Sequence, residues 1–353
     1  MAPIRIALIG LSSAAKTSWA AEGHLPYLQS ARGKSSYEIV ALLNSTFRAP
    51  SSVKTYGDPA ELAADPDIDL VVCNTRVDTH YSTTAPSFKA GKAVYIEWPL
   101  AENLQRSTEL LGNQPSEKGI ISLQIRVSTV VLKLKELRAS DRIGRVLSSD
   151  VSAFSSILPR DALPEGLSYF TDRTIGGNPI MIGYAHMIDY VHEVLGELTP
   201  KVKILGKDDS ILTSGVPDLL AIHGQLAKGK SNVGDKATLT VTWRSGQPFK
   251  GSPGLVWTIN GEKGEIRITS PSGPYLQLTL DEPIKIELHD FESDEVQEIE
   301  WDCKDWQKEL PTPARLSGKG EVEKEKEWPQ LGDALTRMQE LDMRFAQYDA
   351  QKL

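Results

Sequence analysis

The sequence contains little cysteine: Cys73 and Cys303 are the only two thiols in 353 residues. A chain of this length can bury a sizeable core without disulfides, and two scattered thiols are typical of a reducing compartment. The N-terminal run MAPIRIALIG carries Arg5 inside its only apolar stretch, which is not the pattern of a secretory signal peptide. We therefore expect the cytoplasm, with the nucleus as the alternative.

Long hydrophobic runs are also lacking, since no window approaches the roughly 18 apolar residues that a membrane-spanning helix requires. A basic excess is missing too, because 39 Lys and Arg stand against 47 Asp and Glu and give a net charge of −8. Nucleic-acid-binding proteins usually carry such an excess or a basic stripe. We expect neither nucleic acid nor a membrane as a direct partner. We also expect no metal, because no His, Cys, Asp and Glu cluster has metal-ligand spacing.

The composition that is present, 40% hydrophobic and 24% charged residues, is that of a globular protein long enough for two domains. The first third alternates short apolar runs with amphipathic stretches, which predicts an α/β fold with a doubly wound parallel sheet of the Rossmann type. After about residue 127 the chain is mostly strand and turn, and several strands alternate apolar and polar residues, which predicts a large, open, mostly antiparallel sheet. We expect a dinucleotide-binding Rossmann domain over residues 1–127 and a C-terminal α+β substrate and dimerisation domain over residues 128–353.

The residue pattern also predicts individual elements. Residues 183–196 are predicted to form an amphipathic helix within the second domain. Between residues 43 and 56 we expect an irregular loop where doubly wound folds usually have a helix, because Pro50 and several serines disfavour helix there. The other predicted strands are 4–9, 37–43, 68–73, 93–97, 120–124 and 145–154, and the other predicted helices are 14–28, 58–64, 79–90, 128–140 and 331–348.

The turn after the first predicted strand, GLSSAA, stands where dinucleotide-binding folds have G-x-G-x-x-G. Glycines there permit a tight turn and a close approach of the pyrophosphate to a helix N-terminus. Only the first glycine is present, but the next positions are small, and two serine hydroxyls can donate to phosphate. We expect cofactor contacts from Gly10, Leu11, Ser12, Ser13 and Ala14.

The end of the second predicted strand lacks the acidic residue that usually binds the ribose hydroxyls of NAD. Asn44 and Ser45 occupy that place, and Arg48 follows shortly after. Hydroxyls and a guanidinium suit a 2′-phosphate, so we expect NADP(H) to be preferred, with NAD(H) possible. The alternative is that Arg48 is a solvated loop cation.

Two stretches, IDLVVCNTRVDTHYSTTAPSFKAGKAVYIEWPLA and GGNPIMIGYAHMIDYVHEVLGE, resemble the glucose–fructose oxidoreductase / inositol dehydrogenase / rhizopine-catabolism (Gfo/Idh/MocA) family, and the resemblance extends over essentially the whole chain. It implies a nucleotide-binding domain joined to an α/β domain with an open sheet. That sheet commonly mediates dimerisation in the family, so we expect a homodimer formed by the exposed face of the strands in 235–302. The further cofactor-binding residues that we expect are Asn74, Thr75, His80, Glu97 and Trp98.

Two residues depart from the family pattern. The lysine of the family's Glu-Lys-Pro tripeptide is Trp98 here, and an indole N–H donates a hydrogen bond but cannot transfer a proton. The family's aspartate four residues before the helix histidine is Ile182, while the histidine itself is His186. We expect His186, or Tyr184 near it, to transfer the proton. Asp189 shares a helix face with His186, and that pair is either structural or catalytic.

A fungal subgroup of the family has similar departures at both positions. This subgroup includes a galactose-pathway corepressor, which is a regulator that binds a nicotinamide dinucleotide. Two functions therefore follow from the sequence. The first is an NAD(P)-dependent oxidoreductase that moves a hydride to or from a sugar, polyol or other carbonyl compound. The second is a catalytically silent NAD(P)-binding transcriptional regulator with a regulatory protein partner. The resemblance does not specify a substrate.

Overall fold

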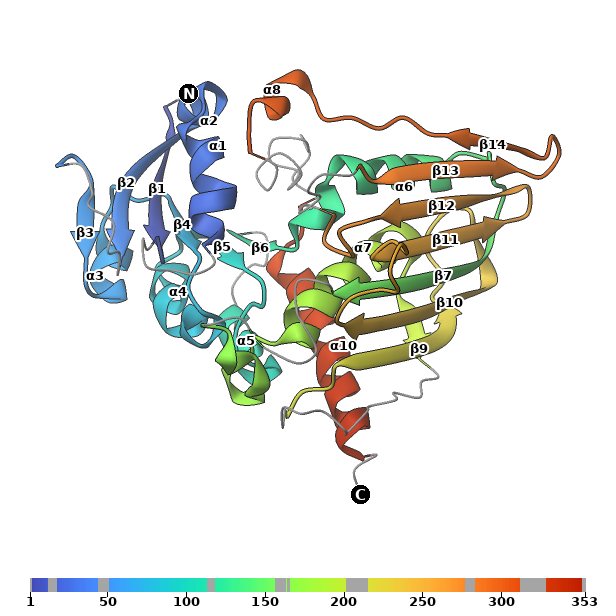
Figure 1. The fold of residues 1–353 in the computed structure, drawn as a ribbon. Helices are drawn as coiled ribbons and strands as arrows, with labels where there is room; N and C mark the ends of the chain where they lie inside the picture. Colours follow the sequence, from blue (N-terminus) through green and yellow to red (C-terminus); the bar gives the residue numbers. More distant parts are fainter. Residues whose placement is uncertain are drawn as a thin grey trace. The chain divides into compact units, whose positions relative to one another are not determined.

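The computed structural model describes residues 2–11, 18–43, 51–112, 118–155, 163, 166–200, 215–276, 283–311 and 328–350 (Figure 1). The chain divides into two compact units. The first consists of Met1–Gln124, Arg173–Gly177 and Asp305–Asp342, and the second of Ile125–Asp172, Asn178–Lys304 and Met343–Leu353. The functional boundary expected at residues 127 and 128 stays a prediction. Two later segments of the chain join the first unit, so the unit is not one continuous stretch.

The first unit is built on a six-stranded parallel sheet in the order β3-β2-β1-β4-β5-β6. This is the strand order of the Rossmann fold, which confirms the predicted fold class. Strand β4 is a run of aliphatic residues and Cys73 that suits a strand covered on both faces. The strands are β1 (Ile4–Ile9), β2 (Tyr37–Leu43), β3 (Lys54–Tyr56), β4 (Leu70–Cys73), β5 (Ala93–Glu97) and β6 (Gly119–Ser122).

Helices α3, α4 and α10 agree with the sequence prediction, whereas α2, α5 and α8 were not predicted and the chain near residue 20 differs from it. There the described chain forms a π-helix over Ala20–His24, followed by two short helices. Helix α4 ends before Gly91, whose φ of 82° is the left-handed conformation expected at a helix C-terminus. The α-helices are α1 (Leu25–Gln29), α2 (Ala31–Ser36), α3 (Pro59–Ala64), α4 (His80–Lys89), α5 (Leu104–Leu111), α8 (Asp305–Lys308) and the first part of α10 (Leu331–Ala350).

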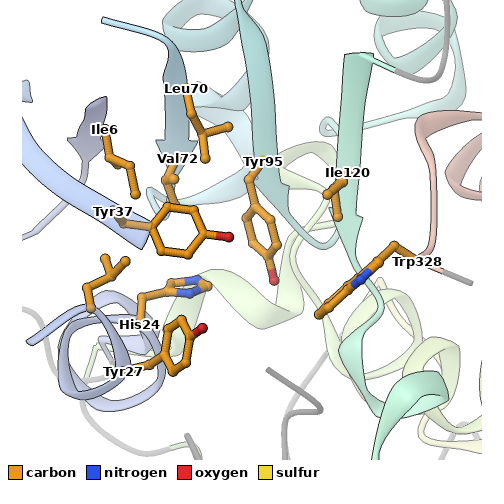
Figure 2. Close-up of a pocket in the computed structure, with 10 residues that line it drawn as sticks. Ile6, His24, Tyr27, Tyr37, Leu70, Val72, Tyr95, Ile120 and Trp328 are labelled. Atoms are coloured by element: carbon orange, nitrogen blue, oxygen red, sulfur yellow. The ribbon is translucent and has the colours of Figure 1, made fainter. Parts of the chain in front are cut away.

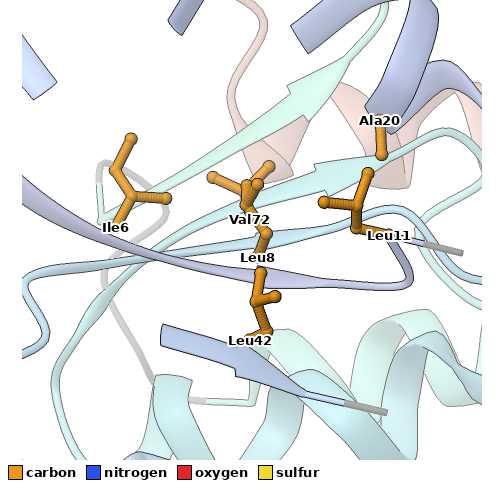
Figure 3. Close-up of a cluster of buried hydrophobic side chains, with 6 residues drawn as sticks. All are labelled: Ile6, Leu8, Leu11, Ala20, Leu42 and Val72. Atoms are coloured by element: carbon orange, nitrogen blue, oxygen red, sulfur yellow. The ribbon is translucent and has the colours of Figure 1, made fainter. Parts of the chain in front are cut away.

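A cavity remains on the side of the parallel sheet that α1 covers (Figure 2). Next to it, alternate residues of β1 and β4 pack with Leu11 and Ala20 in a buried apolar cluster (Figure 3). Alternation places these side chains on one face because successive strand residues point to opposite faces. The cluster therefore fixes the turn that follows β1 to the sheet.

The second unit is built on an eight-stranded sheet in the order β14-β13-β12-β11-β7-β10-β9-β8. The central pair β7 and β10 is parallel and all other pairs are antiparallel, which confirms the mostly antiparallel sheet. Its strands are β7 (Val146–Ser155), β8 (Leu198–Pro200), β9 (Leu219–Leu226), β10 (Val233–Ser245), β11 (Leu255–Gly261), β12 (Gly264–Ser270), β13 (Lys285–Asp290) and β14 (Glu295–Glu298).

Helix α7 (Ala185–Leu195) follows a π-helix over Ile180–Tyr184 and is buried almost throughout. The prediction that it is amphipathic is wrong, because Glu193 is its only residue that is not buried. Its aromatic side chain Tyr190 packs on Trp257 of the sheet and donates a hydrogen bond to the Pro274 carbonyl, 3.1 Å away. Helix α6 (Thr129–Ala139) also belongs to this unit. No helix in the described part of the chain is long and apolar enough to cross a membrane.

Candidate functional site

The carboxyl ends of β1, β4 and β5 meet at one edge of the parallel sheet. Ile9 pairs with Cys73, and Cys73 pairs with Ile96. The residues that follow these strands therefore lie at the same edge, where open α/β sheets bind their ligands. Gly10, Asn74, Glu97 and Trp98, which the sequence predicts as cofactor-binding residues, are brought together in this way.

Gly10 makes the closest approach between two of these strand ends. Its φ is 90°, a conformation that side chains other than glycine rarely adopt. A Cβ at this position would lie 2.7 Å from the Asn74 carbonyl oxygen and 2.9 Å from Cγ2 of Thr75. The first glycine of the turn is thus required both by its backbone conformation and by its neighbours. Leu11 follows Gly10, is 4% exposed, and packs its side chain in the apolar cluster. Any contact of Leu11 with a ligand would therefore come from its backbone.

Asn74 has a polar side chain without a protein partner among the described residues. Its backbone N–H donates to the Ile9 carbonyl at 2.9 Å, which holds the strand ends together. Both polar atoms of its amide are buried and make no hydrogen bond. Buried polar groups in proteins nearly always have hydrogen-bond partners. The amide of Asn74 is therefore a candidate for hydrogen bonding to a ligand.

His80 connects the chain after β4 to the chain after β5. Its Nδ1 lies 2.8 Å from the Pro99 carbonyl oxygen and its Nε2 lies 2.9 Å from the Thr75 carbonyl oxygen. The side chain is 1% exposed, and burial lowers the pKa of the imidazole, against the opposing effect of the two carbonyls. A neutral ring donates to one carbonyl at a time. In the neutral form His80 therefore donates to the carbonyl of either Thr75 or Pro99, depending on the tautomer, while its ring lies between the two segments.

Glu97 ends β5 and is hydrogen-bonded to His24, at 2.6 Å between Oε1 and Nε2. The following peptide bond, Trp98–Pro99, is cis, and the Trp98 side chain is 6% exposed. His24 is a residue that the sequence analysis missed. The two partners stand 73 residues apart, and no local pattern connects them.

Six of the predicted cofactor-binding residues lie outside the described part of the chain. Their assignment stays a prediction. They are Ser12, Ser13, Ala14, Asn44, Ser45 and Arg48.

The second unit holds the residues predicted to transfer a proton. His186 lies on α7 with 9% of its surface exposed. Tyr184 lies just before this helix, is fully buried, and packs edge-on against Trp243 at 6.4 Å between ring centroids. One turn after His186, both carboxylate oxygens of Asp189 are held by Arg126, at 2.8 Å from Nε and 2.5 Å from Nη2. Arg126 is a second residue that the sequence analysis missed, since it lies 63 residues from its partner.

The edge formed by Gly10, Asn74 and Thr75 fits a nicotinamide dinucleotide. Gly10 permits the tight turn and the close contact with the end of β4 that dinucleotide-binding folds have after their first strand. The buried amide of Asn74 supplies a donor and an acceptor to the same space. The six-stranded sheet and this edge together define an NAD(P)-binding protein of the Rossmann class.

The comparisons with known proteins agree with this class. The oxidoreductase family with an NAD-binding Rossmann fold matches residues 4–124, and the family of the Gal80p C-terminal domain matches residues 129–270. The chain belongs to the Gfo/Idh/MocA oxidoreductase family, with a C-terminal domain like that of Gal80p. The resemblance seen in the sequence motifs is confirmed.

Two similar proteins, a dehydrogenase and a regulatory protein, and one solved structure of the latter show this similarity. Dehydrogenase aclE from Aspergillus oryzae is 30% identical over 295 residues, which cover 76% of this chain and 77% of aclE. The galactose/lactose metabolism regulatory protein GAL80 from Saccharomyces cerevisiae is 24% identical over 306 residues, which cover 77% of this chain and 68% of GAL80. The structure of a Gal80p super-repressor mutant from the same yeast has a TM-score of 0.78 at 20% identity and covers 97% of this chain and 95% of its own.

Proposed function

We propose that the protein is an NADP(H)-dependent oxidoreductase that transfers a hydride to or from a sugar, polyol or other carbonyl compound. The observation that carries the proposal is the strand edge at which Gly10 excludes a side chain and the buried Asn74 amide lacks a partner among the described residues. The similarity to dehydrogenase aclE over 76% of the chain supports turnover in preference to binding alone.

The preference for NADP(H) rests on the residues after β2. Asn44 and Ser45 replace the usual carboxylate, which would repel a 2′-phosphate, and Arg48 supplies a positive charge. A guanidinium forms strong, often bidentate hydrogen bonds with phosphate. NAD(H) lacks this phosphate and gains nothing from Arg48.

The bound nicotinamide supplies or accepts the hydride. When the protein reduces a carbonyl, the resulting alkoxide must be protonated, and a positioned acid contributes about 10² to 10⁴ in rate. Trp98 cannot supply this proton. His186 is the stronger candidate, because an imidazole can both donate and accept a proton and His186 keeps 9% of its surface exposed, whereas Tyr184 is fully buried against Trp243.

The test is turnover by a His186→Ala variant, with NADPH and a panel of aldoses, ketones and imines. We expect kcat to fall by at least about 10² while NADPH affinity changes by no more than a few fold, because the residue acts on substrate. His289→Ala is the matched control, since His289 is exposed on β13 and pairs with Asp294. Wild-type turnover in the His186→Ala variant would contradict the assignment and favour Tyr184.

The second candidate function is a catalytically silent, NAD(P)-binding transcriptional regulator. Trp98 in the place of the family lysine and the Gal80p-like C-terminal domain favour it. Such a protein would bind NADPH tightly, turn over no substrate of the panel, and recognise a regulatory protein partner. Under the oxidoreductase proposal the protein works in the cytoplasm, and under the regulator proposal it also works in the nucleus.

We further propose a homodimer formed by the open face of the second sheet. Along β10 and β11, buried side chains alternate with half-buried ones such as Thr240, Thr242 and Thr258. Asp150 of β7 is exposed and stands in register between Thr240 and Thr258, so this face carries hydroxyls and a carboxylate. Sedimentation of a Thr242→Arg, Thr258→Arg double variant tests it: we expect a dimer for the wild type and a monomer for the variant.

A further inference from the structure

A cavity of about 270 Å³ lies on the α1 side of the parallel sheet, within the first unit (Figure 2). Figure 2 shows His24 and Tyr27 on the helical side, Tyr37 and Tyr95 above them, and Trp328 across the cavity. Five rings thus surround one space. The remaining lining residues are the aliphatic side chains Ile6, Leu28, Leu70, Val72 and Ile120.

The side chains that line this aromatic pocket are held in place by contacts with neighbouring residues and with one another. Trp328 is positioned because the next residues run along β6: Ile120 forms an isolated bridge with Gln330, and the Ile121 N–H donates to the Pro329 carbonyl at 3.0 Å. On the other side, the rings of Tyr27 and Tyr37 meet edge to face at 6.3 Å between centroids. The pocket is therefore formed before any ligand enters.

The imidazole of His24 is fixed in the same way. Its Nε2 pairs with Glu97, and its ring meets Tyr95 edge to face at 5.1 Å. The π-helix that carries His24 is a rare conformation that occurs frequently at functional sites. This helix supplies a polar ring to an otherwise apolar wall.

The polar groups that face the pocket are phenol hydroxyls. Tyr95 donates to Ser122 Oγ at 3.0 Å, and that hydroxyl donates in turn to Gln124 Oε1 at 2.8 Å. A phenol oxygen that donates its proton can still accept one from a ligand. Burial raises the pKa of Tyr95 and of Tyr27, so both phenols stay neutral at physiological pH.

The lining also limits the charge of any ligand. Among the described residues, no Lys, Arg, Asp or Glu lines the pocket, and the imidazole of His24 is already hydrogen-bonded to Glu97. A charged ligand would lose its hydration here without gaining an opposite charge, which is costly. Aromatic walls favour flat rings, because edge-to-face pairs contribute beyond simple burial of area.

We propose that the aromatic pocket binds a small, neutral, aromatic molecule that carries a hydroxyl group, at a site separate from that of the dinucleotide. The ring packs between Trp328 and the tyrosines, and the hydroxyl donates to Tyr95. The pocket reaches Ile6 and Leu70, which lie on the face of the sheet and away from the strand ends that bind the cofactor. Both ligands can therefore be bound at once.

The experiment is calorimetric titration of the full chain with 2-naphthol, and with 2-naphthoate as a charged probe of similar shape. We expect 2-naphthol to bind and 2-naphthoate to bind at least tenfold more weakly. Saturation with NADPH should leave the affinity for 2-naphthol within about twofold. Equal affinity for both probes, or displacement of 2-naphthol by NADPH, would overturn the proposal.

Variants locate the binding within the pocket. Trp328→Ala should weaken 2-naphthol at least tenfold, and Tyr95→Phe, which removes only a hydroxyl, by about three- to tenfold. Tyr190→Phe is the matched control, because it removes a buried hydroxyl in the second unit and should leave the affinity unchanged. Unchanged affinity in Tyr95→Phe and Trp328→Ala, with wild-type circular dichroism, would place the ligand elsewhere and refute the site.

Discussion

Arg126 holds both carboxylate oxygens of Asp189 in an ion pair buried inside the second unit. The pair lies one helical turn from His186, the residue to which we assign proton transfer. Its two parallel bonds fix the rotation of α7 about its axis as well as its position. Arg126 and Asp189 therefore act as positioning residues for this part of the helix.

Removal of one partner should be much more harmful than removal of both. Arg126→Ala leaves the Asp189 charge buried without compensation, and we expect the free energy of unfolding to fall by about 3–5 kcal/mol. The double variant Arg126→Met, Asp189→Leu should recover most of this loss. Urea denaturation of the three proteins measures both values. A double variant no more stable than Arg126→Ala would contradict the explanation.

Gly10→Ala tests the close approach of the strand ends. We expect a loss of about 1–3 kcal/mol in the free energy of unfolding from the positive φ alone, together with a large loss of dinucleotide affinity because the new methyl group meets Asn74. Gly251→Ala is the matched control. Its φ is 87°, but a Cβ there has nothing within 4 Å. A variant of Gly10 that binds NADPH like the Gly251 variant would show that the clash is absent.

The buried imidazole of His80 makes stability depend on pH. Burial lowers its pKa in the folded protein, so the folded state favours the neutral ring. The stabilisation is complete above the unfolded pKa of about 6.5 and is lost as the pH falls toward the lowered folded value. In His80→Gln we expect a shallower decline of unfolding free energy between about pH 7 and pH 5, by up to about 1.4 kcal/mol per unit for one proton. His289→Gln, at an exposed position, should keep the wild-type decline.

Trp98 should report cofactor binding. Its position directly after β5 places it at the ligand-binding edge of the sheet. We expect NADPH to quench tryptophan fluorescence, and Trp98→Phe to abolish most of that quench. Trp301→Phe should keep it, since Trp301 lies in the second unit and donates to the Ile284 carbonyl. An unchanged quench in Trp98→Phe would place Trp98 away from the cofactor.

Arg48→Ala tests the cofactor preference. Loss of a charge-assisted hydrogen bond should weaken NADPH by about 1.5–3 kcal/mol, while NADH affinity should hardly change. Fluorescence titrations with both cofactors measure the difference. Equal losses for NADPH and NADH, or tighter binding of NADH by the wild type, would exclude the proposed role of Arg48.

The sequence predicted those parts of the fold that depend on local periodicity. The runs at β1, β2 and β5 predicted strands with the observed bounds, and Gly10 marked the turn after β1, because each signal lies within a few neighbouring residues. Partnerships across the chain, such as His24 with Glu97, left no such signal. Helix α7 was misjudged because its His, Asp and Tyr residues suggest a wet face, whereas in the structure these polar groups are buried and the recorded bonds of Asp189 and Tyr190 go to other parts of the second unit.

The contact of Pro329 and Gln330 with β6 has a consequence for how the protein folds during synthesis. A ribosome delivers residues 1–124 first, yet Pro329 and Gln330, the partners of Ile121 and Ile120, are made much later. Gly119 leaves room for the Leu331 side chain, which arrives equally late. Until that later segment is made, the edge strand β6 of the nascent Rossmann sheet lacks these described partners, which exposes it to pairing with other chains. Synthesis of residues 329–331, and not of residues 1–124 alone, completes this edge of the nucleotide-binding unit.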